Sequence, residues 1–315
     1  YWETTPPTIS EKNQSRTFFT QKATPQFLRS IARFREFPES DVPEVAFVGR
    51  SNVGKSSLLN ALVNSNAGTK SAILARTSAT PGCTRTMNLY GLGPKDGGVR
   101  IKPGKNNGHD RIVGVGGVLL VDLPGYGEGS LAEWGAEIMK YLTRRKQLRR
   151  VFVLVDALHG VKEKDLSLLA ALRLAGVPHQ VVLSKVDRVY VPKAKRLDRI
   201  SKGVVSKLVQ PLGTLEEARE RMLDVKETIQ PAVGAGALGE LLSVSAEVRV
   251  DENRLGVDGV RFAILRAAGF RFEVESASGK QKMGKFSAGS RSVYVPSQRE
   301  HVSAVDGKKN KMVWA

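Results

Sequence analysis

The segment from Gly49 to Ser56, GRSNVGKS, has the residue types and the spacing that bind a phosphate group. It follows the apolar run VAFV and precedes the helical pattern KSSLLNALV. Glycines let backbone N–H groups turn inward around phosphate oxygens, and the N-terminus of the following helix adds positive charge. In this position, the pattern G-x-x-x-x-G-K-[S/T] favours a phosphate-binding loop (P-loop) over a merely structural turn.

Within this loop, Lys55 would reach the β- and γ-phosphates, and the Ser56 hydroxyl would ligate Mg²⁺. The predicted nucleotide contacts of the loop are Gly49, Arg50, Ser51, Asn52, Val53, Gly54, Lys55, Ser56 and Ser57. A second motif, VDLPGYG, ends an apolar run at Asp122. We expect Asp122 to hold Mg²⁺ through water, and the Gly125 N–H to meet the γ-phosphate.

The base is predicted from the segment Ser184-Lys185-Val186-Asp187, which ends the apolar run QVVLS. The Asp187 carboxylate can accept two hydrogen bonds from guanine N1–H and N2–H₂, whereas adenine offers no such donor pair. Lys185 can lay its methylenes along the base and the ribose. In SVSAE, Ser245 and Ala246 follow the last apolar run, where a backbone N–H of Ala246 can meet guanine O6; a plain strand end explains this segment almost as well.

These residues need a scaffold that brings distant loops together, and the pattern of the chain predicts one. Short apolar runs alternate with helical patterns, which is typical of βαβ units and of a mostly parallel sheet covered on both faces. We expect an α/β fold with six strands, at 44–48, 86–90, 118–122, 151–157, 180–184 and 241–245. We expect helices after most of them, at 55–63, 132–145, 164–176, around 193–209 and at 257–269.

The domain organisation is predicted from the segments that interrupt this alternation. Residues 1–40 lack sustained periodicity and form an N-terminal extension, and residues 41–270 form the α/β domain. Residues 91–117, crowded with Gly, Asn, Lys and Arg, and residues 211–240 are insertions in that domain. Residues 271–315 form a basic C-terminal tail.

Composition limits the class of protein further. The chain has 315 residues, 41% of them hydrophobic, and a net charge of +18. No apolar run approaches the ~20 residues of a membrane span, and the single Cys83 excludes an internal disulfide framework. The positive charge suggests a polyanionic partner such as RNA, DNA or anionic lipid, or a basic organellar protein whose charge is merely tolerated. The four histidines, at 109, 159, 179 and 301, lack metal-ligand spacing.

Taken together, the chain closely resembles the EngB (YihA/YsxC) ribosome-biogenesis GTPases of the TRAFAC class, which have a P-loop NTPase G domain. The resemblance rests on PEVAFVGRSNVGKSSLLNAL, ARTSATPGCTRTMNLY, LLVDLPGYGEG and the run from Trp134 through DALHG to VVLSKVD. It implies binding of GTP and GDP with Mg²⁺. It also implies that Thr84, in the first switch, approaches Mg²⁺ and the γ-phosphate; Lys55, Thr84 and Gly125 are then the predicted catalytic residues.

The resemblance suggests a second cation, K⁺, and the chain differs from the usual pattern of GTPases at three positions. Asn52 matches the asparagine that helps to coordinate K⁺ in potassium-dependent relatives, although Asn is also a good turn residue. Cys83 stands where the family usually has Lys, and Ser184 where Thr or Asn is usual. Tyr126 stands where Ras-like enzymes place the glutamine that orients water, so we expect slow intrinsic hydrolysis, helped by a cation or a partner.

The function that the resemblance implies is a monomeric GTPase that assembles the large ribosomal subunit by contacting its RNA and proteins. Insertions and tails beyond the compact bacterial pattern favour a mitochondrial, eukaryotic member located in the matrix; the cytoplasm of a bacterium is the alternative. A second hypothesis is a non-catalytic, GTP-bound scaffold on ribosomal RNA. A third, a small-molecule or tRNA-modifying GTPase, finds no second catalytic constellation in the sequence.

Overall fold

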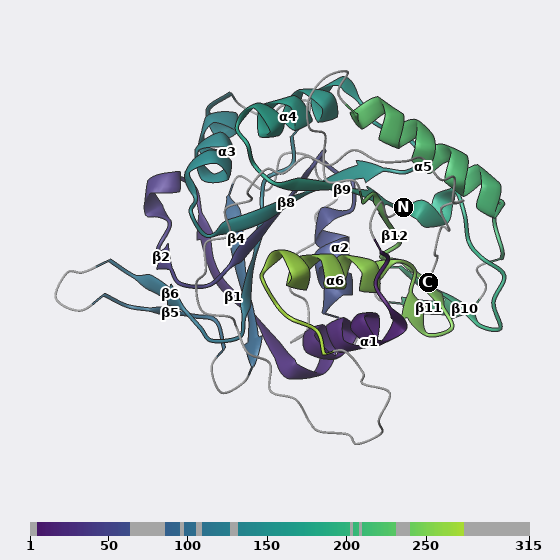
Figure 1. Ribbon diagram of the computed structural model, residues 1–315, viewed down its shortest axis with the longest axis horizontal. Helices are drawn as coiled ribbons and strands as arrows, with labels where there is room; N and C mark the ends of the chain where they lie inside the picture. Colours follow the sequence, from purple (N-terminus) through teal and green to yellow (C-terminus); the bar gives the residue numbers. More distant parts are fainter. Residues whose placement is uncertain are drawn as a thin grey trace, which may run out of the picture.

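Seven strands form the central sheet of the computed structural model, which describes residues 5–63, 86–94, 98–104, 109–126, 132–201, 204–207, 210–230 and 240–273. Their order is β1-β4-β7-β3-β8-β9-β12 (Figure 1). Their bounds are β1 (Ala23–Ile31), β3 (Glu44–Gly49), β4 (Met87–Pro94), β7 (Val118–Asp122), β8 (Leu148–Asp156), β9 (His179–Ser184) and β12 (Leu242–Val244). The pairings from β7 to β12 are parallel, and those of β1 with β4 and of β4 with β7 are antiparallel.

The α/β class with a mostly parallel sheet is therefore confirmed, but the predicted count of six strands is wrong. The additional strand, β1, pairs along its whole length with β4 at the edge of the sheet. It lies within the 1–40 extension, where the sequence shows no sustained alternation. An edge strand that is mostly solvated has no need of a buried apolar run, and most of its residues are intermediate or exposed.

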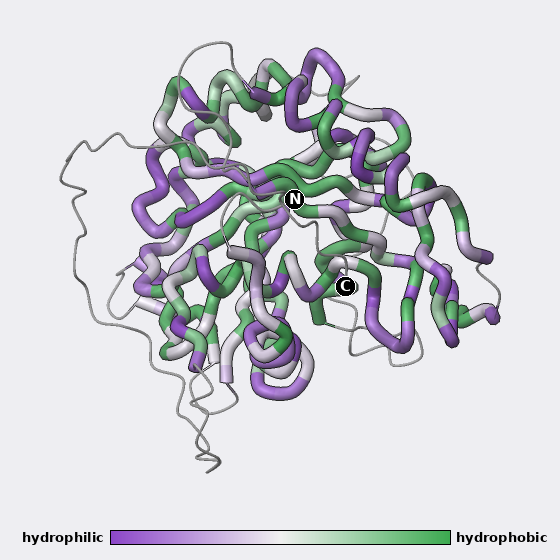
Figure 2. Tube along the Cα trace, turned by 45° about the vertical axis from the view of Figure 1, so that its right-hand side comes forward, coloured by the Kyte–Doolittle hydropathy of each residue, from purple (hydrophilic) through white to green (hydrophobic). Residues whose placement is uncertain are grey.

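Helices cover both faces of the sheet (Figure 1). One face carries α3 (Ala132–Arg144), α4 (Glu163–Leu174) and α5 (Leu215–Ile229); the other carries α1 (Ile9–Thr17), α2 (Lys55–Leu62) and α6 (Val257–Ala267). A separate core lies under each set: Tyr141, Leu169 and Met222 pack in the first, and Leu59, Phe152 and Ile264 in the second. Figure 2 shows the central strands as the most hydrophobic part of the fold.

Two small sheets extend this body. A three-stranded sheet joins β2 (Glu39–Ser40), β6 (Arg111–Val113) and β5 (Arg100–Lys102), so the 91–117 segment contains an antiparallel β5–β6 pair. A four-stranded sheet runs β11-β10-β13-β14. Its strands are β10 (Leu197–Ser201), β11 (Val204–Lys207), β13 (Val248–Val250) and β14 (Asn253–Arg254).

The helix expected around 193–209 is wrong, because β10 and β11 form an antiparallel hairpin there. In β10 the exposure alternates along the strand: Asp198 and Ile200 are buried, and Arg199 and Ser201 are exposed. The remaining short elements are a π-helical turn η1 (Phe18–Lys22) and the 3₁₀ turns η2 (Phe34–Glu36) and η4 (Val186–Arg188). Among the described residues, no helix has both the length and the apolar character to cross a bilayer.

Candidate nucleotide-binding site

The phosphate loop joins β3 to α2, and its backbone requires glycine at two places. A Cβ on Gly49 would lie 2.9 Å from the carbonyl oxygen of Leu154 and 2.9 Å from a methyl of Val53. Gly54 has φ of 101°, and Asn52 has φ of 63°, both in the left-handed region. The loop therefore turns back tightly on the sheet before α2 begins at Lys55.

Helix α2 has different partners at its two ends. Gly54 caps its N-terminus without a side chain, which leaves the first N–H groups to an anion. At its C-terminus the buried Arg261 of α6 donates from Nε to the Leu62 carbonyl at 2.8 Å and from Nη2 to the Ala61 carbonyl at 3.0 Å. Asp258 holds the same guanidinium at 2.7 Å. A cation at the C-terminus favours the helix dipole, whose positive end is at the phosphate site.

Lys55 lies against the predicted magnesium ligand. Its Nζ is 2.8 Å from Oδ1 of Asp122, and the two side chains are 10% and 4% exposed. Burial raises the pKa of the Asp122 carboxyl, and the charge of Lys55 opposes this shift. The buried Asp122 carboxylate and the hydroxyl of Ser56, the residue after Lys55, are hard oxygen donors of the kind that Mg²⁺ takes, so the residues present are compatible with the predicted cation.

The segment after Asp122 is hydrogen-bonded to the phosphate loop. Tyr126 N–H donates to the Gly49 carbonyl at 3.3 Å, and Ser51 N–H donates to the Tyr126 carbonyl at 3.1 Å. A Cβ on Gly125 would lie 3.1 Å from both the backbone nitrogen and Oγ of Ser51. The structure therefore brings Gly125 to the loop, with little space for a side chain.

Tyr126 uses its hydroxyl away from the phosphate loop. The hydroxyl donates to Oδ1 of Asp165 at 2.6 Å, and Arg50 Nε lies 3.2 Å from Oδ2 of the same buried carboxylate. Burial, with the nearby Asp165 charge, raises the pKa of Tyr126 above its usual range. Tyr126 thus stays protonated and holds position rather than acting as a base. The Arg50 side chain is also engaged here, so only its backbone is left for a phosphate.

The predicted guanine segment is braced against the phosphate loop. Ser184 Oγ donates to the Val53 carbonyl at 2.6 Å. Lys185, with φ of 55°, donates from Nζ to the Asn52 carbonyl at 2.8 Å and lies 2.8 Å from Oδ2 of Asp156. These two hydrogen bonds, which span 131 and 133 residues of the chain, join the loop and the guanine segment into one unit.

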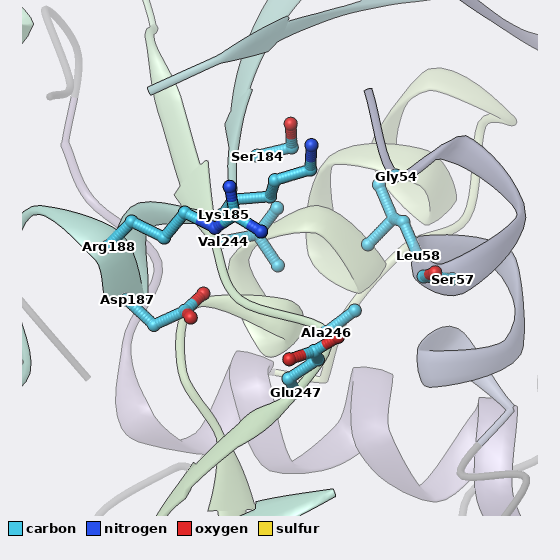
Figure 3. A pocket seen from close by; sticks show the side chains of 10 residues that line it. All are labelled: Gly54, Ser57, Leu58, Ser184, Lys185, Asp187, Arg188, Val244, Ala246 and Glu247. Carbon is cyan, nitrogen blue, oxygen red and sulfur yellow. The ribbon is translucent and has the colours of Figure 1, made fainter. Parts of the chain in front are cut away.

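A pocket opens beside this unit, and Figure 3 shows its lining. Residues of α2 lie on one side and Asp187 with Arg188 on the other, with Ala246 and Glu247 closing the lower part of the view. The lining residues are Gly54, Ser57, Leu58, Ser184, Lys185, Asp187, Arg188, Val244, Ala246 and Glu247. Asp187 and Ala246, predicted from two separate segments, thus meet at one cavity.

Four lining residues were not predicted: Leu58, Arg188, Val244 and Glu247. Arg188 follows Asp187 directly and Leu58 lies on α2 one turn after the loop, so the motifs themselves could have indicated them. Val244 and Glu247 flank the segment expected to contact guanine O6. Only the pairing of β12 with β9 shows that they reach the cavity.

Ser245 does not line the pocket. It is fully buried, and its Oγ accepts from the N–H groups of Glu247 at 3.2 Å and Val248 at 3.0 Å. Arg254 donates to the Ala246 carbonyl. Burial lowers the pKa of Arg254 to about 10, which leaves the guanidinium charged at neutral pH. Ser245 and Arg254 therefore shape the loop that presents Ala246.

Some predicted residues cannot be placed. Thr84 and Cys83 lie outside the described residues, as does His301. Asn52 is exposed, and the role of its side chain toward K⁺ stays a prediction. Within the part of the chain that the structure describes, no group of three His, Cys, Asp or Glu could hold a metal ion on its own.

Comparisons with known proteins show the family of the chain. A family profile described as "50S ribosome-binding GTPase" matches residues 44–185. The probable GTP-binding protein EngB of Mesorhizobium japonicum is 40% identical over 177 residues, covering 54% of this chain and 74% of the relative. That of Sinorhizobium fredii is 36% identical over 217 residues, covering 66% of this chain and 91% of the relative. The chain belongs to the EngB family.

Solved structures similar to this EngB-family GTPase include two with low sequence identity. A crystal structure of a probable GTP-binding protein EngB is 18% identical, with a TM-score of 0.39 over 71% of this chain and 98% of that one. Aquifex aeolicus Era bound to GDP·AlF₄⁻ is 19% identical, with a TM-score of 0.45 over 73% of this chain and 57% of that one.

Proposed function

We propose that this EngB-family GTPase hydrolyses GTP to GDP and phosphate as an assembly factor for the large ribosomal subunit. The observation that carries the proposal is the meeting of the phosphate loop, Gly125 and the Asp187 pocket in one site. Such a site can recognise guanine and the γ-phosphate together, and contacts to a γ-phosphate can order loops that release after hydrolysis. The family profile, described as ribosome-binding, and the basic surface support the ribosomal partner.

Cations complete the proposed site. Ser56 and Asp122, with Thr84 by resemblance, would hold Mg²⁺, which supplies charge neutralisation between the phosphates when it is bound. Asn52 is the residue proposed for K⁺. Because Tyr126 is a protonated donor to Asp165, it cannot orient water as a glutamine would, and intrinsic turnover is slow. We expect KCl to raise the turnover above that in NaCl at the same ionic strength.

Base specificity is tested by comparing GTP with ITP, which lacks the guanine N2 amino group. One hydrogen bond to a charged acceptor is worth about 1.5–3 kcal/mol, so the wild type should prefer GTP by roughly tenfold to a hundredfold. Asp187→Asn should lose most of that preference. Glu247→Gln, a matched change at another carboxylate in the pocket lining, should keep it. An unchanged preference in Asp187→Asn would assign the base contact to another residue.

The ribosomal role is tested by crosslinking the tagged protein in extract, loaded with a non-hydrolysable GTP analogue or with GDP, and sequencing the bound RNA. Enrichment of large-subunit rRNA only with the GTP analogue is the expected result. Equal recovery in both states, with no turnover in the presence of ribosomal particles, would favour the second candidate, a GTP-bound scaffold. The observation behind that candidate is the engagement of Tyr126 by Asp165.

We propose the mitochondrial matrix as the compartment, with large mitochondrial subunit precursors as the target and the monomer as the active form. The support is the length of the insertions beyond the compact bacterial pattern. A bacterial cytoplasm is the alternative. Fractionation of cells that express the tagged full-length protein distinguishes the two.

A further inference from the structure

The described part of the segment between residues 188 and 207, namely 188–201 and 204–207, carries six basic residues and one acidic residue. It contains η4's last residue, the loop that follows, and the β10–β11 hairpin; we call it the basic hairpin segment. In Figure 1 the hairpin lies at the rim of the molecule, beyond the central sheet. Strand β11 is an edge strand, and all four of its residues are exposed.

Most of this charge is available to a partner. Arg188, Lys193, Lys195 and Lys207 are exposed and make no ion pair with another described residue. Arg196 and Arg199 are also exposed but are paired with acidic side chains.

The other described basic cluster, residues 144–150, differs. There Arg145 is bound to the buried Glu44, and Arg150 donates to Gln180, so part of its charge serves the interior. Three side chains, Arg144, Lys146 and Arg149, remain exposed. This second surface therefore offers a matched comparison for the basic hairpin segment.

The basic hairpin segment is linked directly to the nucleotide pocket. Arg199 Nη2 lies 2.9 Å from Oε2 of Glu247, which lines the pocket. Ile200 N–H donates to the Glu247 carbonyl at 2.7 Å. A ligand bound to β10 would therefore be connected to the Ala246 loop of the pocket through two contacts: the Arg199 ion pair with Glu247 and the Ile200 backbone hydrogen bond to Glu247.

We propose that the basic hairpin segment is the surface on which this protein binds the phosphate backbone of RNA. The identification of RNA as the ligand rests on the proposed function. The location of the binding surface rests on the exposed basic side chains that have no acidic partner among the described residues. A cation density this high matches a polyanion rather than a small acidic ligand. The β10–β11 hairpin contains no aromatic residue, whereas aromatic side chains mark proteins seated in a bilayer interface.

The test compares two triple variants of the full chain that remove the same charge. One is Lys193→Gln, Lys195→Gln and Lys207→Gln; the other is Arg144→Gln, Lys146→Gln and Arg149→Gln. Binding of a short fluorescent single-stranded RNA is measured between low and high salt. For single strands the slope of log K against log [salt] is about −0.7 per phosphate contact. Loss of three phosphate contacts should lower the magnitude of this slope by about 2. At ~0.1 M salt this corresponds to about a hundredfold weaker RNA binding.

The expected result is this change in the hairpin variant and little change in the 144–150 variant. Equal slopes in the hairpin variant and the wild type would overturn the proposal. A second result would also overturn it: the wild type binds anionic lipid vesicles at the same salt concentration, and the hairpin variant loses this binding as strongly as it loses RNA binding. The segment would then serve a lipid surface. A normal thermal unfolding transition and normal GDP binding show that each variant is folded.

The same variants separate this inference from the function on which it rests. If the hairpin variant still recovers large-subunit rRNA in the GTP-analogue state, the surface is wrong and the proposed function stands. The converse is that the wild type shows no enrichment of large-subunit rRNA in the crosslinking experiment, while the salt dependence of RNA binding still differs between the hairpin variant and the wild type. In that case the RNA-binding surface is correct and the ribosomal role is wrong.

Discussion

Two lysine–aspartate pairs, both with an N–O distance of 2.8 Å, stand at opposite ends of the nucleotide site. At the phosphate end, Lys55 and Asp122 are 10% and 4% exposed, and at the base end Lys185 and Asp156 are 28% and 6% exposed. The two pairs have the same N–O distance, yet the pKa values of their carboxyl groups are shifted in opposite directions. The pKa of Asp122 is raised, chiefly by burial, whereas that of Asp156 is lowered.

The difference lies in the other partners. Burial alone would raise the pKa of Asp156, but Lys185 and the backbone N–H groups of Leu158 and His159 outweigh it. Lys185 also donates to the Asn52 carbonyl, so this pair is part of a brace. Asp122 has Lys55 as its counter-charge, and the phosphates and Mg²⁺ offer both side chains better partners. We therefore expect the first pair to exchange partners on binding of the proposed ligand and the second to persist.

The largest expected effect comes from breaking the exchangeable pair. Lys55→Met should weaken binding of a fluorescent GDP analogue by about a hundredfold or more, because a charge-assisted contact to phosphate is lost at a water-poor site. Lys140→Met, which removes an exposed lysine paired with Glu137 on α3, is the control and should bind normally. Binding by Lys55→Met within a few-fold of the wild type would mean that Lys55 stays on Asp122 in the complex.

A smaller effect is expected at the brace. Lys185→Met keeps the apolar stem beside the proposed base position but removes the lysine that donates to Oδ2 of Asp156 and to the Asn52 carbonyl. We expect about tenfold weaker GDP binding and a loss of roughly 1 kcal/mol in the free energy of unfolding, since the lysine is partly exposed. Calorimetry of the nucleotide-free protein and a titration measure the two. Should Lys185→Met lose as much affinity as Lys55→Met with no loss of stability, the two pairs would not differ in kind.

The smallest effect concerns pH. The folded-state pKa of Asp156 lies below its unfolded value of about 3.9. Its contribution to stability is therefore fully present above about pH 4 and is lost as the pH falls through the folded-state pKa. Urea unfolding from pH 7 down to pH 3 should show wild type more stable than Asp156→Asn by up to about 1 kcal/mol. That gap should close at the acid end, and a gap that widens there would contradict the sign.

The sequence predicts the phosphate side of the site better than the base side. Asp122 ends a buried apolar strand, and Lys55 and Gly125 follow such strands within a few residues. The fold brings Lys55 to Asp122, and Gly125 to Ser51 of the phosphate loop. The partnership of Tyr126 with Asp165 joins residues 39 apart, and no local pattern indicates it.

The base side depends on a sheet whose strands do not look like strands. In β10 and β11, basic residues interrupt the alternation at spacings that also suit a helix, so the sequence favours the wrong element. The pairing of β10 with β13 makes this segment a strand rather than a helix, and that pairing joins residues about fifty apart in the sequence. Glu247 reaches the pocket through the pairing of β12 with β9 and is held from outside by Arg199 and Ile200 of β10.

The capping of α2 by Arg261 has a consequence for the order in which the protein becomes competent during synthesis. The phosphate loop is made before the guanidinium that satisfies the far end of its helix, which lies 199 residues after Leu62, on α6. Until α6 has been made and has docked, the Ala61 and Leu62 carbonyls lack their buried partner. While the intervening residues are being added, a nascent chain therefore carries the complete loop motif without the arginine that caps the far end of its helix.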